Sequence, residues 1–206
     1  MGRGKGFVTP DVMISTRPPE IEDRAVPGHW EGDLILGGRS SAIGTLGERT
    51  TRFTMLLPLP PMPRHGVEVR ETNGPALAGH GAAEVRDAIA RAIATPLPQH
   101  LRHSLTWDQG AEMAQHAQLR LDSGLHIFFC DPHSPWQRGT NENTNGLLRQ
   151  YFPKGTDLRG VTVSDLNAVA FTLNTRPRKT LAWRTPAEAL DQLLLSHSTA
   201  GVATTS

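Results

Sequence analysis

The chain has one cysteine, Cys130, among its 206 residues, and it has no long hydrophobic run. A single cysteine permits no internal disulfide and no zinc site built on several cysteines, which agrees with a reducing compartment. The apolar run at residues 127–130 is typical of the apolar runs in this chain. It is far shorter than the ~20 residues of a membrane-spanning helix. Residues 1–5 lead into no signal-peptide core. We therefore expect a cytoplasmic protein without a membrane partner.

The sequence also lacks a strong excess of either charge. Its 21 Lys and Arg residues nearly balance its 20 Asp and Glu residues, so the overall composition does not indicate a nucleic-acid partner. The distribution is uneven, because residues 138–184 contain eight basic residues and three acidic ones. A local excess of this kind is typical of a surface that faces a polyanion, although an ordinary solvated segment explains it equally well when taken alone.

The length fits one ordinary domain with a sizeable core. Residues 1–27 are rich in proline and glycine and have no sustained helix or strand period, so we interpret them as an N-terminal leader that lies along the domain surface. Residues 28–195 are expected to form the core with appended C-terminal helices. Residues 196–206 are mostly small and are expected to be a disordered tail.

Hydrophobic periodicity predicts an α/β domain. Strands are expected at residues 29–36, 41–47 and 53–57, and their short connections favour an antiparallel meander. After a long loop at residues 58–81, helices are expected at 82–94, 111–121 and 140–152, with strands at 105–108 and 126–130 between them. Two more helices are expected around 166–173 and 185–194. Three antiparallel strands followed by two parallel strands, all flanked by helices, match a ribonuclease-H-like mixed sheet.

Three carboxylates lie at positions that suit catalysis. Asp33 is in the first strand, where an unpaired charge is costly. Asp108 ends the fourth strand, and the carboxyl ends of parallel strands are where open α/β sheets bind ligands. Glu142 lies in the first turn of the following helix, a position that favours negative charge. On that helix Glu142, Asn145 and Arg149 share a polar face, which suits metal and phosphate binding, although taken alone such a face is more often a solvated surface.

Several motifs in this region are similar to those of one known family. The sequence reads GHWEGD at 28–33, LTWDQG at 105–110 and DPHSPWQRGTNEN at 131–143, followed by NGLLRQYFPKG at 145–155 and RPRKTL at 176–181. Together they resemble the catalytic core of bacterial insertion-sequence transposases of the IS-thirty family, over roughly residues 17–195. The 33 residues between Asp108 and Glu142 match the spacing of that family's DDE signature.

The resemblance implies an active site in which Asp33, Asp108 and Glu142 hold two Mg²⁺ or Mn²⁺ ions. Carboxylate oxygens are the ligands that such hard cations prefer, and an ion pair can assist in-line phosphoryl transfer. The implied partners are DNA, as transposon ends and target, and further copies of the chain on DNA or a full-length transposase. Only some 28 residues precede the first strand, and they contain no helix pair. We therefore expect this chain to lack the family's helix-turn-helix region and to bind DNA without sequence preference.

Other residues are weaker candidates. A set of polar and aromatic residues near the catalytic helix is expected to contact DNA: Trp136, Arg138, Asn145, Arg149, Lys154, Arg178 and Lys179. Glu31 and His133 are candidate accessory residues, and both have equally ordinary structural explanations. Cys130 ends an apolar strand and is expected to be a buried, inert thiol. His100 and His103 lack the partners of a zinc site.

Two alternatives to a transposase core remain. One is a ribonuclease-H-like nuclease that hydrolyses DNA without strand transfer. The other is an inactive remnant that binds DNA or a full-length transposase. The residue pattern does not separate these possibilities.

Overall fold

The computed structural model describes residues 8–22, 24–39, 41–60, 81–132 and 134–200. Its centre is a five-stranded sheet in the order β3-β2-β1-β4-β5. Strands β1 (His29–Leu36), β2 (Ala42–Glu48) and β3 (Thr54–Pro58) form the predicted antiparallel meander. Strands β4 (Ser104–Trp107) and β5 (His126–Phe129) continue the sheet parallel to β1. The predicted mixed sheet is therefore confirmed.

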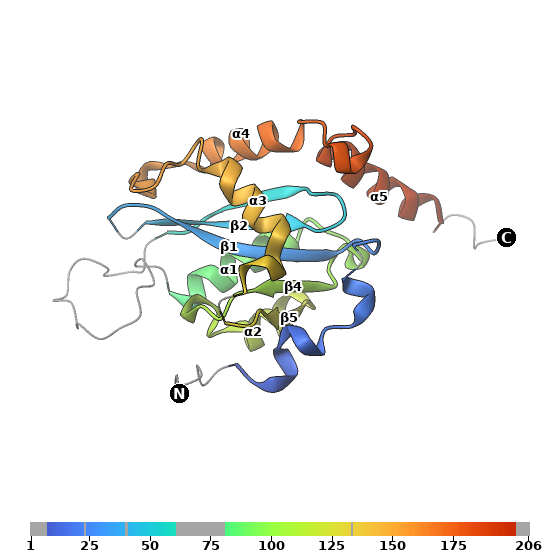
Figure 1. The fold of residues 1–206 in the computed structure, drawn as a ribbon, viewed down its shortest axis with the longest axis horizontal. Coiled ribbons are helices and arrows are strands. Elements are labelled where there is room, and N and C mark those ends of the chain that lie inside the picture. Colours follow the sequence, from blue (N-terminus) through green and yellow to red (C-terminus); the bar gives the residue numbers. More distant parts are fainter. Residues whose placement is uncertain (1–7, 23, 40, 61–80, 133, 201–206) are drawn as a thin grey trace.

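Helices cover both faces of this sheet (Figure 1). Helices α1 (Ala82–Ile93) and α2 (His116–Ser123) pack together on one face, and α3 (Gly139–Leu148) and α4 (Val163–Asn174) lie on the other. Helix α5 (Pro186–Ala200) follows α4. Alternation along β1 explains the two layers, because Trp30 belongs to the core under α1 whereas Ile35 belongs to the core under α3 and α4.

Two predicted helices differ from the observed ones. The segment expected as one helix at 111–121 is a 3₁₀ turn at Ala111–Met113 followed by α2, which ends at Ser123 and is capped by Gly124 in the left-handed conformation. The helix expected at 140–152 ends at Leu148. Pro153 disfavours helical geometry in the residue before it, and Phe152 turns into the core instead.

The ends of the chain contribute more structure than their composition suggests. Residues 10–21 form three 3₁₀ turns, in which Val12, Ile14 and Ile21 are buried. Met13 forms a parallel bridge to Phe129, so this part of the leader covers the β5 edge of the sheet. At the other end α5 continues to Ala200, and residues 201–206 of the expected tail lie outside the described residues. No described helix is both long and apolar enough to cross a membrane.

Candidate active site

Asp33 and Asp108 come together on neighbouring strands. The last paired residues of β1 and β4 are Glu31 and Thr106, and each aspartate lies two residues further along the chain, Asp33 within β1 and Asp108 just after β4. The Nη1 atom of Arg138 is 3.1 Å from Oδ2 of Asp33, and its Nη2 atom is 3.8 Å from Oδ2 of Asp108. Arg138 therefore places one positive charge between the two carboxylates.

Arg138 is held in this position by the turn that precedes α3. It ends the 3₁₀ turn Pro135–Arg138, is only 8% exposed, and donates a hydrogen bond to the Gly32 carbonyl. Burial acts to lower the pKa of the Arg138 guanidinium, but Asp33 and Asp108 outweigh it and raise that pKa above its ordinary value. The sequence predicts a DNA contact for Arg138; in the structure its side chain contacts the aspartates.

Asp33 is fixed by more than this ion pair. Its Oδ1 atom accepts a hydrogen bond from the Leu34 backbone N–H at 2.8 Å, and Nδ2 of Asn145 donates to its Oδ2 atom at 3.1 Å. Burial raises the pKa of the Asp33 carboxyl, Arg138 and the Leu34 N–H act against the rise, and Asp108 adds to it. Oδ1 of Asp108 in turn accepts from the Gly110 N–H. Both carboxylates are therefore held in defined positions before any ligand binds.

Helix α3 contributes a second row of polar groups beside Asp33. The hydroxyl of Thr45 on β2 lies within hydrogen-bond distance of Oδ1 of Asn141, at 3.2 Å, and of Oδ1 of Asn145, at 3.3 Å. The two asparagines are one helical turn apart and so share a face. Asn145 is one of the residues predicted from the sequence, whereas Asn141 is not, although its spacing of four residues from Asn145 indicates the shared face.

Glu142 does not join the two aspartates in this structure. It lies on α3 between Asn141 and Asn145 in sequence, but its side chain is exposed. Among the described residues, no three histidine, cysteine or acidic side chains are close enough together to hold one metal ion. The structure thus assembles two of the three predicted carboxylates and carries the third on the adjacent helix.

The donor set still fits a divalent cation. The side chains of Asp33 and Asp108 are 26% and 47% exposed, so an ion can reach their oxygens. Mg²⁺ and Mn²⁺ prefer such oxygen ligands and keep several waters. The Arg138 guanidinium beside both carboxylates indicates that this position favours positive charge.

Glu31 anchors the helix that carries Glu142. Its side chain is fully buried, and its Oε2 atom accepts the backbone N–H groups of Thr140 and Asn141 at 2.9 and 3.1 Å. Its Oε1 atom pairs with Nε of Arg49 at 2.9 Å. Arg138, the residue before α3, supplies no side-chain cap, so Glu31 takes over the capping role from a distant strand. Glu31 is a predicted accessory residue, whereas Arg49 is not predicted, because its role depends on a tertiary contact.

The remaining candidates lie in different settings. Trp136, Lys154 and Lys179 are exposed, Arg178 is half-buried, and His133 lies outside the described residues. Nη1 of Arg149 donates to the carbonyls of Leu36 and Phe152, so this side chain ties α3 to the end of β1. Cys130 is buried, which raises the pKa of its thiol to about 11 and makes it unreactive, as expected.

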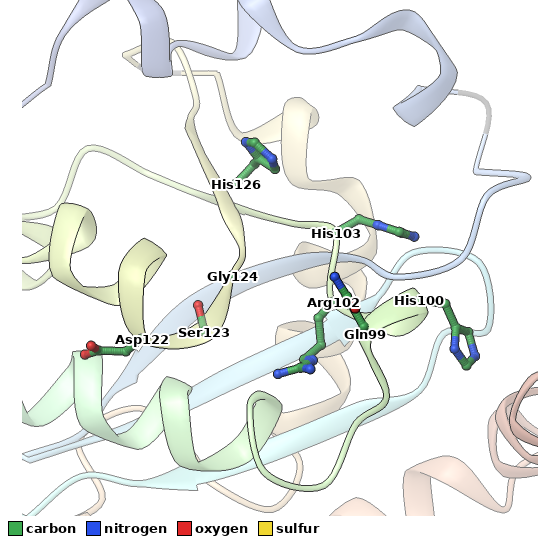
Figure 2. A pocket seen from close by; sticks show the side chains of 8 residues that line it. All are labelled: Gln99, His100, Arg102, His103, Asp122, Ser123, Gly124 and His126. Atoms are coloured by element: carbon green, nitrogen blue, oxygen red, sulfur yellow. The ribbon is translucent and has the colours of Figure 1, made fainter.

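A histidine-lined hollow of about 900 Å³ lies at the opposite end of the parallel strands. His103 and His126 lie at the starts of β4 and β5, whereas Asp108 follows the end of β4. Figure 2 shows that the lining side chains point in different directions and do not converge on one point. This hollow is therefore not part of the carboxylate site.

Comparison with known proteins identifies relatives over most of the chain. The transposase for insertion sequence element IS1086 from Cupriavidus metallidurans is 49% identical over 191 residues, which are 92% of this chain and 51% of that protein. Transposase InsI for element IS30C from Escherichia coli is 43% identical over 190 residues, 92% of this chain and 45% of that protein. The transposase for element IS4351 from Bacteroides fragilis is 34% identical over 198 residues, 96% of this chain and 55% of that protein.

A solved structure has a similar fold. A chain of the simian T-cell lymphotropic virus intasome in complex with PP2A regulatory subunit B56 gamma superimposes with a TM-score of 0.53 and 18% identity, covering 79% of this chain and 54% of that one. This likeness and the sheet order confirm the ribonuclease-H-like fold. No protein-family model matches the chain. The chain spans about half the length of the relatives named above. Over that half, its homologues are transposases of IS30-type insertion sequences.

Proposed function

We propose that this chain is the catalytic core of a DDE transposase, which breaks and joins DNA strands with the help of divalent metal ions. The observation that carries the proposal is the pair of aspartates at the end of β4 and in β1, with a cationic group between them. The sequence relationship to IS30-type transposases supports the same activity.

In this proposal Asp33, Asp108 and Glu142 hold the metal ions, Mg²⁺ or Mn²⁺. When bound, a pair of such ions activates the attacking oxygen and stabilises the leaving one. The chain's own part is to hold the ligands in place. The Leu34 N–H and Asn145 orient Asp33, and the Gly110 N–H orients Asp108. Glu31 fixes the start of α3 and thereby the backbone that carries Glu142.

The proposed substrate is DNA, which reacts in two successive steps. Water first attacks a phosphodiester at the element end, so that one P–O bond forms, another breaks, and a free 3′-hydroxyl is released. That hydroxyl then attacks a phosphodiester of the target, joining the strands and releasing a target 3′-hydroxyl. Each step exchanges one P–O bond for another and needs no covalent enzyme intermediate. Joining two element ends to one target needs two active sites, so we also propose that copies of the chain assemble on DNA.

A strand-transfer assay tests this function. The purified chain is incubated with a labelled, pre-cleaved DNA end and a target plasmid, with Mg²⁺ or Mn²⁺ and with EDTA. Joined products that require the divalent ion are the expected result. Nicked plasmid without joined products would instead support the nuclease alternative, and the absence of both reactions would support the inactive remnant.

A further inference from the structure

A polar groove lies along α3, away from the aspartates. Its volume is about 230 Å³, and its lining includes Gly139, Asn143 and Leu147 on α3. Asn145, which contacts Asp33, points to the other side of the helix, because residues 143 and 145 are about 200° apart around the helix axis. Helix α3 therefore separates this groove from the carboxylate site.

Three arginines from three distant segments converge on the groove. Arg24 precedes β1, Arg52 lies in the turn between β2 and β3, and Arg178 lies in the connection from α4 to α5. All three are half-buried. The segments before β1, between β2 and β3, and after α4 thus place three guanidinium groups around one opening.

These charges have no acidic partner among the described residues, because none of the observed ion pairs includes Arg24, Arg52 or Arg178. Burial lowers the pKa of the Arg52 guanidinium, and the nearby charge of Arg24 lowers it further. Glu31 and Glu48 act in the opposite direction, but both are already engaged. Glu31 pairs with Arg49, and Glu48 accepts backbone N–H groups, including that of Gly28. The described residues that line the groove therefore carry a net positive charge.

Some hydrogen-bond donors of the groove have no partner within the described part of the chain. Nε of Arg178 is buried and has no partner in the described part of the chain, and its Nη2 atom makes only a 3.5 Å contact with the Leu173 carbonyl. Arg52 donates from Nη1 to Thr140 Oγ1 at 2.6 Å, which uses one of the five N–H donors of a guanidinium. Asn143 and Thr180 add exposed polar groups at the rim.

We propose that this groove binds a phosphodiester of the DNA backbone other than the reacting one. Arginine, threonine and asparagine side chains are among the groups that contact DNA phosphates, and the groove is separated from the carboxylate site only by α3. This step rests on the proposed function. Contacts of this type position the DNA and are independent of its sequence. The groove thus adds Arg24 and Arg52 to the DNA-contacting residues and gives Arg178 a defined role.

The salt dependence of DNA binding tests the groove. The variant Arg24→Gln/Arg178→Gln keeps Arg52 and its bond to Thr140, and fluorescence anisotropy measures its affinity for a labelled duplex across a range of salt concentrations without divalent ions. Each phosphate contact contributes ~0.9 to the slope of log affinity against log salt. We expect the variant to lower the slope by about 1 to 2. The single variant Arg24→Gln removes one of these two charges and should lower the slope by a smaller amount.

A matched control removes two exposed arginines on the other face of the sheet. Arg91→Gln/Arg120→Gln changes the charge equally on α1 and α2, and should leave the slope at the wild-type value. A groove variant with the wild-type slope, or a control that lowers the slope equally, would overturn the proposal. Poly-glutamate that binds the wild-type chain but not the groove variant, while DNA binds both alike, would assign the groove to an acidic protein partner and also overturn it.

Cleavage is measured separately on the same preparations. A wild-type chain that shows the predicted slopes but no metal-dependent cleavage would contradict the proposed function and leave the groove in place. Normal cleavage with unchanged slopes would contradict the groove alone.

Discussion

At the scale of single residues, the site is organised by buried arginines that pair with carboxylates. Arg138 bridges Asp33 and Asp108, and Arg49 pairs with Glu31. A buried ion pair contributes little net stability, but removing one partner leaves an uncompensated charge and is costly. These residues therefore tie the geometry of the site to the stability of the fold.

His29 is a buried titratable residue outside the carboxylate site. Its Nδ1 atom is 2.7 Å from Ser104 Oγ, and its ring lies 5.4 Å from that of His103. Burial, with His103, Arg49 and Arg17 adding to it, lowers the pKa of His29 from 6.5 to about 4. Between these two pH values the unfolded chain takes up a proton that the folded protein excludes. The free energy of unfolding should therefore fall as pH drops through this window.

We expect His29→Gln to remove this pH dependence, which should amount to about 1–3 kcal/mol between pH 6.5 and pH 4. Urea denaturation at several pH values measures it, as the difference between wild type and variant. The exposed His126 provides the control, and His126→Gln should keep the wild-type profile. A His29→Gln profile that parallels the wild type would show that His29 does not titrate in this way.

At the scale of elements, helix α3 links the site to the sheet. Its N-terminus is capped by Glu31 from β1, and its middle contacts Asp33 and Thr45 through Asn145. The aspartate site lies on one side of this helix, and the arginine-lined groove lies on the other. Its placement therefore decides where Glu142 can reach.

Glu31→Gln should weaken metal binding through the position of α3. The substitution removes the charge that caps α3 and leaves Arg49 unpaired, which should lower the free energy of unfolding by about 3–5 kcal/mol. We expect the Mn²⁺ concentration for half-maximal cleavage to rise several-fold, with activity largely restored at saturating Mn²⁺.

Glu48→Gln separates this effect from lost stability. Glu48 is also a buried carboxylate that accepts backbone N–H groups, but no described hydrogen bond or ion pair joins it to α3. Glu48→Gln should lower stability and leave the Mn²⁺ dependence unchanged. An equal shift in both variants would assign the effect to general destabilisation.

Two glycines test the packing on either side of Asp33. A Cβ atom at Gly32 would lie 2.1 Å from the Trp107 ring, whereas one at Gly146 on α3 would meet nothing within 4 Å. Gly32→Ala should therefore lower the free energy of unfolding by at least about 1–3 kcal/mol. Gly146→Ala should raise it by up to about 1 kcal/mol, because alanine favours a helix interior. Chemical denaturation of both variants measures these opposite changes in the free energy of unfolding. A Gly32→Ala protein as stable as the wild type would contradict the observed strand packing.

At the scale of the whole molecule, the sequence is sufficient to predict the architecture but not all contacts of the site. Helical periodicity in α1 and α4 predicts these elements because their buried residues recur on one face of the helix. The burial of Val12 and Ile14 in the leader has no such period, since these residues lie in 3₁₀ turns against the sheet edge. The bridge by Arg138 joins segments more than a hundred residues apart, which no local pattern reveals.

Measurement of metal-dependent DNA cleavage by the variants Asp33→Asn, Asp108→Asn and Glu142→Gln tests the central claim most directly. Each substitution removes one carboxylate charge at nearly constant volume, so we predict that each abolishes cleavage in Mg²⁺ and Mn²⁺ while circular dichroism stays unchanged. Asp122→Asn, an exposed site on α2, should keep wild-type cleavage. Glu142→Gln is the most informative of the three, because the structure leaves Glu142 outside the aspartate pair. A folded Glu142→Gln protein with near-normal metal-dependent cleavage would contradict the three-carboxylate site.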